Sequence, residues 1–336
     1  MTLHRRVFLL FLLVSLGGCP PPAGQTTTSG ASGQGGVTVQ PDACGRIDVS
    51  PVGRKVYAFL QASADLDRAS LELEASVADA CRKMATILGV DATGGTKVVC
   101  ARAADALEAN LQVSVRTESR LVTRHTPAVC HTDVSFTAGI VAQCEARAAA
   151  DVQVSCDGRC SGTCDGTCSG LCAGGAGGGQ CHSQCDGTCS GRCSGSCDGY
   201  ASVEASAECK ASAEIRATTH TTCTEPKVEV VRQDVTVVDD SKFQLAVAAI
   251  DAGLPRILWA TKRLELAGRA LVQWVSTGAS LVRASGDLVA QLGESGLCVG
   301  GQLASVIAST ANIQARFEVS IEVSARVSAS AGAQGN

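Results

Sequence analysis

The first strong pattern in the chain is helical and runs from residue 51 to about residue 89. Apolar residues recur every three or four positions through this stretch, which begins with PVGRKVYAFL. Ser50 suits a helix N-cap, and Pro51 suits the first helical position. We therefore predict a long amphipathic helix that ends near Gly89, followed by a shorter helix from Thr96 to Asn110.

A similar order returns towards the C-terminus. Ser241 and Gln244 fit a capping box at the start of a helical pattern that continues to about Leu292. A short segment follows, and apolar and polar residues then alternate from 312 to 331, as they do in ANLQVSV at 109–115. Alternation is typical of strands. We therefore predict two halves, each made of a helix, a second helix and a strand.

Alternation also marks two segments nearer the middle of the chain. Apolar or small residues take the even positions between Val134 and Val154, and the odd positions between Ala201 and Ala217. A period of two is that of a β-strand with one covered face. We therefore predict that both segments are strands.

Between these two segments lie two rows of cysteines, with a cysteine at every fourth position. The first row is CDGRCSGTCDGTCSGLC (156–172), and the second is CHSQCDGTCSGRCSGSC (181–197). In an antiparallel hairpin, the residue numbers of two directly opposed residues always add to the same sum. When the two rows are aligned end to end, 156 with 197 and 172 with 181, this sum is 353. Two pairs of cysteines outside the repeat give the same sum, so they support this register independently.

This register predicts a hairpin arm from 129 to 224 with seven cross-strand disulfides. Opposed β residues lie at separations that a disulfide can bridge. Because glycine-rich strands have low β propensity, the tip at 156–197 is either a regular β-ladder or a coiled disulfide knot. The predicted pairs are Cys130–Cys223, Cys144–Cys209, Cys156–Cys197, Cys160–Cys193, Cys164–Cys189, Cys168–Cys185 and Cys172–Cys181.

Four further cysteines lie outside the arm. Cys81 and Cys100 lie on either side of the turn between the first two predicted helices, so we predict that they form a disulfide across it. Cys44 and Cys298 are then paired by elimination.

The N-terminus indicates the compartment in which these cysteines reside. MTLHRRVFLLFLLVSLGGC has a short basic region and an apolar run that is too short for a permanent transmembrane helix. The residues Leu16-Gly17-Gly18-Cys19 resemble the lipobox of bacterial lipoprotein precursors. This resemblance implies that 1–18 is a signal peptide, and that Cys19 is lipidated and anchors the mature chain in the bacterial cell envelope. Because Pro20 follows, and not the Asp that commonly retains lipoproteins in the inner membrane, we expect the outer membrane.

The mature chain would begin with a tether from 19 to 43, rich in Gly, Ser, Thr and Pro. A chain of this composition and length has an expected reach of about 25–30 Å. Exported cysteines meet an oxidising compartment in which disulfides persist. With Cys19 set aside, 18 of the 19 cysteines remain, and an even number permits full pairing.

Composition narrows the possible functions. Loss of Arg5 and Arg6 with the signal peptide leaves 26 basic and 32 acidic residues, a net charge of −6. Such a balance provides no electrostatic footprint for nucleic acid. Aromatic residues make up only 3% of the chain, so any core is thin, and we expect its stability to depend on cross-links.

The sequence offers no catalytic residue and no cofactor motif that we recognise, so we do not predict an enzyme. Zinc sites typically use Cys-x-x-Cys pairs, which the uniform Cys-x-x-x-Cys rows do not provide, and no metal is predicted. The Asp-Gly steps lack the acid and the spacing of a calcium loop. His220 would lie opposite Asp133 in the predicted hairpin, where we interpret them as a surface charge pair.

Together these patterns predict an α+β lipoprotein. Two helix-helix-strand halves, 44–128 and 225–336, flank a long antiparallel β-hairpin arm with a disulfide-laddered tip, and the strand from 312 to 331 joins the sheet. We expect a structural or adhesive envelope protein that presents a stiff projection; the alternative is a cysteine-rich metal-binding or thiol-redox lipoprotein. The expected partners are the membrane, through the N-terminal lipid, and a second copy or another envelope protein.

Overall fold

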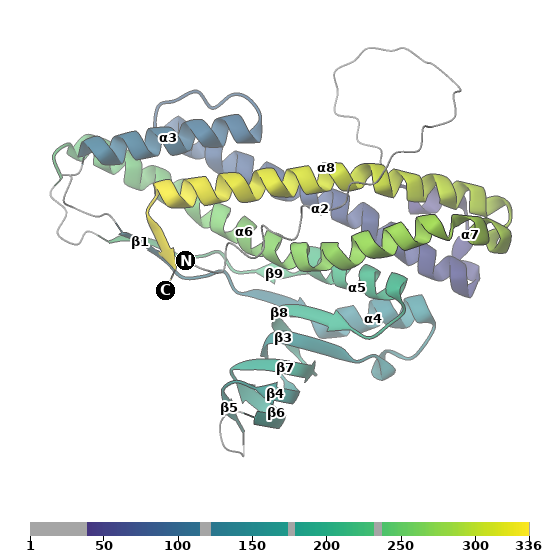
Figure 1. The fold of residues 1–336 in the computed structure, drawn as a ribbon. Helices are drawn as coiled ribbons and strands as arrows, with labels where there is room; N and C mark the ends of the chain where they lie inside the picture. The colour runs from purple at the N-terminus through teal and green to yellow at the C-terminus, as the bar shows by residue number, and fades with distance from the viewer. Residues whose placement is uncertain (1–38, 115–121, 174–178, 232–236, 336) are drawn as a thin grey trace, which may run out of the picture. The chain divides into compact units, whose positions relative to one another are not determined.

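The computed structural model describes residues 39–114, 122–173, 179–231 and 237–335 of the 336-residue chain. The predicted signal peptide, Cys19 and the tether up to residue 38 lie outside the described residues. Val39 is 3% exposed and packs in the main core, so the last residues of the predicted tether, from 39 to 43, belong to the packed structure. The fold is α+β, with long helices packed together and a disulfide-linked antiparallel sheet (Figure 1).

Long helices form most of the described structure. Helix α2 contacts α3, α5, α6 and α8, and its buried side chains are central to the main core. The α-helices are α2 (Pro51–Ile87), α3 (Thr96–Ser114), α4 (Val134–Glu145), α5 (Ala207–His220), α6 (Asp240–Arg283), α7 (Ser285–Leu292) and α8 (Glu294–Ser330). Three short 3-10 helices are η1 (Pro41–Cys44), η2 (Ile47–Val49) and η3 (Ala149–Asp151).

The first two predicted helices are confirmed as α2 and α3. Ser50 is the N-cap of α2, where its hydroxyl accepts a hydrogen bond from the Gly53 amide at 3.0 Å, and Pro51 is the first helical residue. The helix ends two residues before Gly89, which has a φ of 71°. This positive φ favours glycine and explains where the helical pattern stops.

The long C-terminal helical pattern divides into α6 and α7. The N-cap of α6 is Asp239, whose carboxylate accepts from the Lys242 amide at 3.1 Å, so the predicted capping box of Ser241 and Gln244 is wrong. A carboxylate is a strong N-cap, and its charge also interacts favourably with the helix dipole.

The two predicted strands at 109–115 and 312–331 are wrong, because both segments are helical. Helix α3 continues to Ser114, and α8 continues to Ser330. In α8 the buried residues follow a helical spacing, as Ile313, Phe317 and Val327 show. The alternating sequence therefore places apolar residues around much of the helix, and some of them stay exposed.

The predicted strands at 134–154 and 201–217 are also largely wrong. Residues 134–145 form α4, and residues 207–220 form α5, which packs against it. The Asp133 carboxylate caps α4 by accepting from the amides of Ser135 and Phe136, at 2.8 and 3.1 Å. Alanine-rich segments favour a helix, and small residues at the intervening positions hide the helical period. The arm is therefore a pair of helices followed by a shorter sheet.

That sheet has eight strands in the order β5-β6-β4-β7-β3-β8-β2-β9. Its strands are β2 (Cys130–Asp133), β3 (Val154–Cys160), β4 (Thr163–Cys168), β5 (Leu171–Cys172), β6 (Gly179–Asp186), β7 (Thr188–Cys193), β8 (Ser196–Val203) and β9 (Thr222–Cys223). A separate three-stranded sheet contains β1 (Val122–His125), β10 (Val228–Val231) and β11 (Ala333–Gly335), with β1 in the centre.

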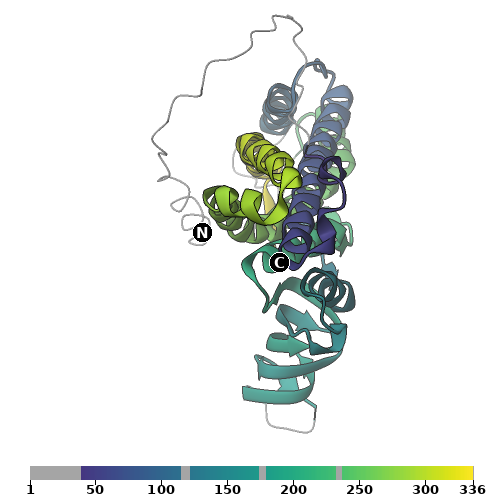
Figure 2. The same cartoon turned by 90° about the vertical axis from the view of Figure 1, so that its right-hand side faces the viewer.

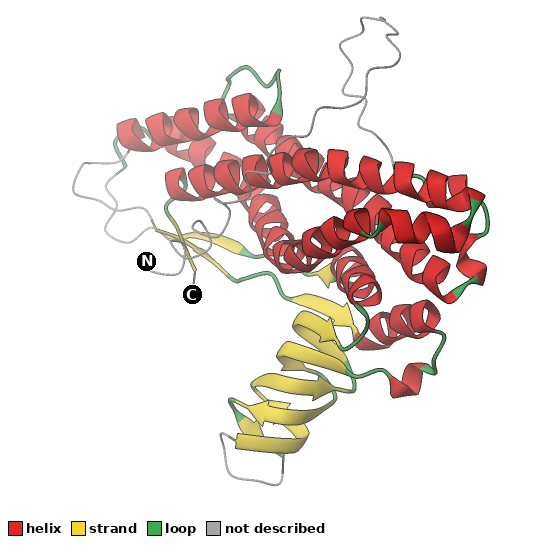
Figure 3. Cartoon of the chain, turned by 45° about the vertical axis from the view of Figure 1, so that its right-hand side comes forward, coloured by secondary structure: helices red, strands yellow, loops and turns green. Residues whose placement is uncertain are grey.

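The two cysteine rows do not form one flat hairpin, because their strands alternate in the sheet. Strand β7 pairs antiparallel with both β3 and β4, so β3 and β4 are parallel, although only two residues separate them. Asp165 lies opposite His182 on one side and opposite Arg192, ten residues further on, on the other. The two rows therefore wind around each other, so that each inner strand of one row lies between two strands of the other, and Figure 3 shows these strands stacked.

We call the wound segments, residues 154–172 and 179–203, the cystine coil. Each inner strand of the coil has a paired strand on either side. The residue numbers of paired residues add to 347 on one side of the strand and to 357 on the other. The sum of 353 therefore describes its disulfides but not its backbone register, and the tip is a coil and not a flat ladder.

Helices α6 and α8 are each long and apolar enough to cross a membrane, judged by length and composition. Their most apolar windows are 44% and 33% buried, respectively. Helix α6 packs against α2, α3, α5 and α8, which accounts for much of its apolar surface.

Candidate functional site: the cystine coil

Disulfides fill the inside of the coil. All ten cysteines of the two rows except Cys172 are at most 3% exposed. The aliphatic side chains of the same core cluster lie at one end of the coil, on α4, α5, the start of β3 and the end of β8. The five bonds are Cys156–Cys197, Cys160–Cys193, Cys164–Cys189, Cys168–Cys185 and Cys172–Cys181, with Cα–Cα separations of 5.6 to 5.9 Å. Sulfur therefore takes the place that aliphatic side chains hold in an ordinary core.

Four more disulfides lie outside the coil. The bonds Cys130–Cys223 and Cys144–Cys209 link β2 to β9 and α4 to α5. The bonds Cys81–Cys100 and Cys44–Cys298 link α2 to α3 and η1 to α8. These nine pairs are the same as those drawn from the sequence.

Glycine is required where the wound strands approach each other. A Cβ atom built on Gly166 would lie 2.5 Å from the Ser190 carbonyl oxygen and 2.7 Å from the Cα of Gly191. The same close approach relates three further pairs, Gly158 with Gly199, Gly162 with Gly195, and Gly170 with Gly187. Side chains of any size would separate the two backbones at these positions.

The serines of the Cys-Ser-Gly repeats stabilise the bends of the coil. At the bend after β3, the Ser161 hydroxyl accepts a hydrogen bond from the Ser196 amide at 2.8 Å. The hydroxyls of Ser169 and Ser194 accept in the same way from the amides of Thr188 and Thr163, each at 2.9 Å. These bonds satisfy amides at the bends between strands. The sequence does not mark these bends by a regular signal, because Ser190, in the same Cys-Ser-Gly context, lies inside β7.

Polar contacts attach the coil to the helices. The Arg269 guanidinium on α6 pairs with the Asp157 carboxylate on β3 at 2.8 Å, and lies over the Tyr200 ring at 5.7 Å. His131 on β2 pairs with Asp198 on β8. Both pairs connect a strand of the coil to an element outside it. They therefore fix the end of the coil that lies nearest to the helices.

The most deeply buried of these contacts is between Tyr200 on β8 and Glu214 on α5. Glu214 is 2% exposed and accepts hydrogen bonds from the Tyr200 hydroxyl and the Val203 amide. Burial raises the pKa of the Glu214 carboxyl above its usual value, although these donors and Lys210 act in the opposite direction. Burial and the Glu214 charge also raise the pKa of Tyr200.

We expect Glu214→Gln to stabilise the protein at neutral pH. Because the native pKa of Glu214 is raised, the contribution of this carboxyl to stability is fully present below the ordinary glutamate pKa of about 4.3 and is lost as the pH rises through the native pKa. The amide variant cannot ionise, so it avoids this loss. Urea unfolding between pH 4 and pH 8 measures the difference, with Glu318→Gln on the exposed face of α8 as the control. Parallel pH profiles for wild type and Glu214→Gln would contradict the assignment.

None of the protein-family models, curated proteins and solved structures compared with this chain matches it. Its function is therefore inferred from the coil and from the surfaces around it.

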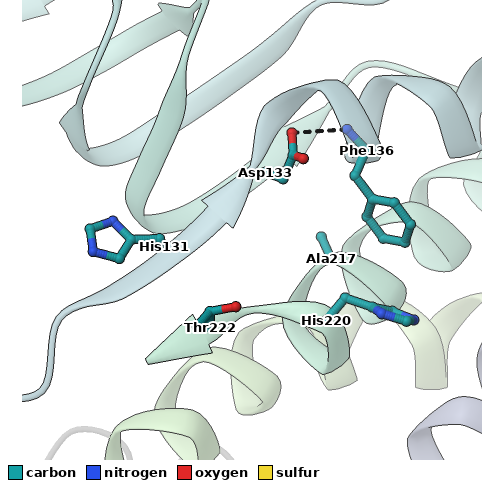
Figure 4. A pocket seen from close by; sticks show the side chains of 6 residues that line it. All are labelled: His131, Asp133, Phe136, Ala217, His220 and Thr222. Carbon is teal, nitrogen blue, oxygen red and sulfur yellow. Dashed lines mark hydrogen bonds between the residues drawn. The ribbon is translucent and has the colours of Figure 1, made fainter. Parts of the chain in front are cut away.

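A pocket of about 260 Å³ lies between β2, β9, α4 and α5 (Figure 4). Its lining residues are His131, Asp133, Phe136, Ala217, His220 and Thr222. The Asp133 carboxylate caps α4, and the His220 ring packs against the Phe136 ring with centroids 4.9 Å apart. Asp133 and His220 thus share this pocket, but each interacts with α4 and not with the other as a charge pair.

No metal centre is evident at the pocket or elsewhere in the described ranges. Within them, no group of three His, Cys, Asp or Glu side chains is placed to hold a metal ion. All 18 cysteines after Cys19 are in disulfides, so none of them is a thiolate ligand in this structure.

Proposed function

We propose that this protein is a membrane-anchored structural or adhesive lipoprotein of the bacterial envelope, and that the cystine coil is its stiff projection. The observation that carries the proposal is the cystine core. Nine disulfides are typical of a protein that folds in an oxidising compartment outside the cytoplasm. The lipobox-like residues before Cys19 support attachment to a membrane.

The construction of the coil supports a mechanical role. Each inner strand is hydrogen-bonded on both sides, and each of the five disulfides links the first row to the second. A local opening therefore has to break backbone hydrogen bonds while the disulfides still hold the strands together. Such an object keeps its shape and resists proteolysis without a large hydrophobic core.

The outer face of the coil suits a surface that meets water or a polar partner. The side chains between the cysteines and glycines are mainly Asp, Ser, Thr, Gln and Arg. Asp165 and His182, paired at 2.5 Å, lie on exposed positions of neighbouring strands. A spacer needs only this solubility, whereas an adhesin would use the same polar rows for contact.

The alternative function, metal binding or thiol-redox chemistry, requires accessible thiols. Catalytic and metal-binding cysteines act as thiolates in partly exposed sites. The cysteines of the coil are instead oxidised and, apart from Cys172, buried. This state favours the structural function over the alternative.

Lipid attachment is the part of the proposal that can be tested first. In a bacterial host that processes lipoproteins, we expect the full chain to incorporate radiolabelled palmitate and to sediment with membranes. Cys19→Ala should lose both properties, because it removes the thiol that carries the lipid. A double variant, Cys164→Ala with Cys189→Ala, is the matched control, since it also loses cysteines but keeps Cys19.

Equal labelling of wild type and Cys19→Ala would overturn the anchor. Labelling that disappears in the control pair but persists in Cys19→Ala would place the lipid on another cysteine. The localisation to the outer membrane is tested in the same cells by separating the two membranes on a density gradient.

A further inference from the structure

One face of α8 is apolar and is not covered by the rest of the described chain. Leu297 is 73% exposed and Ile307 is 44% exposed, and no charged residue occurs from 295 to 315. The helix contains an 18-residue window that is apolar enough to cross a membrane, but only 33% of that window is buried. A contiguous exposed apolar surface on a folded protein commonly marks an interaction site.

The chain from the proposed anchor enters the described structure beside this face. The Gln40 amide donates to the Gln302 side-chain oxygen on α8 at 2.8 Å, and the Cys44–Cys298 disulfide fixes η1 to the same helix. Val39, at the start of the described chain, is buried in the main core. Cys19 precedes Val39 by only twenty residues, a length whose composition predicts a reach of about 25 Å.

The cystine coil joins a different part of the helical structure. Helix α8 contacts α2, α3, α6 and α7, whereas strand β8 of the coil contacts mainly α4 and α5 and, to a smaller extent, α6 (Figure 1). Figure 2, turned by 90°, also shows the coil extending away from the long helices on the side where α4 and α5 lie. Contact at the exposed face of α8 would therefore leave the coil free.

We propose that the exposed face of α8 around Leu297 and Ile307 rests on the bilayer that holds the lipid of Cys19. This inference depends on the proposed lipidation. A lipid occupant is favoured over a second copy because the tether holds the face close to its own membrane, which raises the effective concentration of lipid at the face. The contact is apolar, since 295–315 contains no Lys or Arg to attract anionic headgroups.

The proposal predicts the side chains that lose contact with water on vesicles. We would reconstitute the lipidated mature protein on phosphatidylcholine vesicles and oxidise it with hydroxyl radicals, with soluble Cys19→Ala protein as the reference. Oxidation of Leu297 and Ile307 should fall at least about fivefold, because side chains in the acyl boundary are removed from water. Leu171, 64% exposed on β5 of the coil, should be oxidised equally in both samples.

A matched pair of variants separates docking from tethering. Leu297→Asp should restore oxidation of Ile307 on vesicles to its value in solution, whereas Leu171→Asp should leave the protection of Ile307 intact. Both variants should still float with the vesicles, since neither changes Cys19.

Each other outcome overturns the proposal in a recognisable way. Protein that floats with the vesicles but keeps full oxidation of Leu297 and Ile307 is anchored without docking, and the proposed function survives. Protection of these residues already in soluble Cys19→Ala, rising with protein concentration, assigns the face to a second copy. Protein that does not float with the vesicles lacks the anchor, and both proposals then fail.

Discussion

Full reduction of the protein will unwind the cystine coil and leave the helices folded. The core of the coil consists mainly of cystine, with a few small or branched aliphatic side chains. The helices have their own core, which includes Phe59, Leu60 and Trp274. After reduction, we expect amide hydrogens in 154–203 to exchange as in an unfolded chain, while the emission of the two tryptophans of α6 stays unchanged.

The expected effect is large, because a native disulfide in a small domain contributes about 2–5 kcal/mol and the coil contains five. The matched control is Cys81→Ala with Cys100→Ala, which removes the α2–α3 disulfide. That variant should lose stability in the helices but keep full protection of the coil. Persistent protection of 154–203 in protein whose 18 thiols all titrate would show that backbone hydrogen bonds alone hold the coil.

Gly166→Ala will prevent the coil from closing. The new methyl group would lie 2.5 Å from the Ser190 carbonyl oxygen, and the obstacle is the backbone of β7, so no side chain can move aside. Overpacking of this kind costs about 3 kcal/mol. We expect free thiols in the secreted variant, because displaced strands no longer hold Cys164 and Cys168 against their partners.

Gly268→Ala is the control for this substitution. Gly268 lies within α6, and apart from its chain neighbours and the nearby backbone of α6 no atom lies within 4 Å of the place that a Cβ would take there. Alanine should therefore stabilise the helix by up to about 1 kcal/mol. A count of thiols under denaturing conditions compares the two variants. Fully oxidised, thermally stable Gly166→Ala would mean that the strands can separate without breaking the coil.

The pairing of the cysteines could be predicted because it depends on positions along the chain and not on secondary structure. The residue numbers of seven cysteine pairs have the same sum, and this relation holds whether the segments between the cysteines are strands or helices. For example, Cys144–Cys209 joins two helices that were predicted to be strands. The same reasoning could not give the backbone register. Winding shifts neighbouring residues by several positions on each side, and no residue pattern in the two rows announces it.

The wrong strands share one cause, which is a high content of alanine and other small residues. In α4, for example, Thr137 and Ala138 are both buried, so small residues serve either face and erase the helical period. In α8 alternation is genuine, yet a helix of 37 residues that packs on α2 and α3 forms in preference to a strand. Ile321, 45% exposed, is a consequence of placing an alternating sequence on a helix.

The contacts at the base of the coil were beyond sequence reasoning for a different reason. Arg269 meets Asp157 across 112 positions, and Glu214 is buried where α5 packs against β8 of the coil and against other helices. Neither residue differs from an ordinary surface residue when it is read in its local sequence. Such sites emerge only when separate elements are packed together.

The coil also constrains the order in which the chain can fold. Its disulfides close loops whose ends are 9, 17, 25, 33 and 41 residues apart, counted from Cys172–Cys181 towards Cys156–Cys197. The entropic cost of closing a loop is smallest for the shortest one, which Cys172–Cys181 closes. Each later disulfide then adds only eight residues to a segment that is already wound. The coil therefore has a kinetic direction: it nucleates at its free end, zips towards the helices, and reaches Cys144–Cys209 and Cys130–Cys223 last.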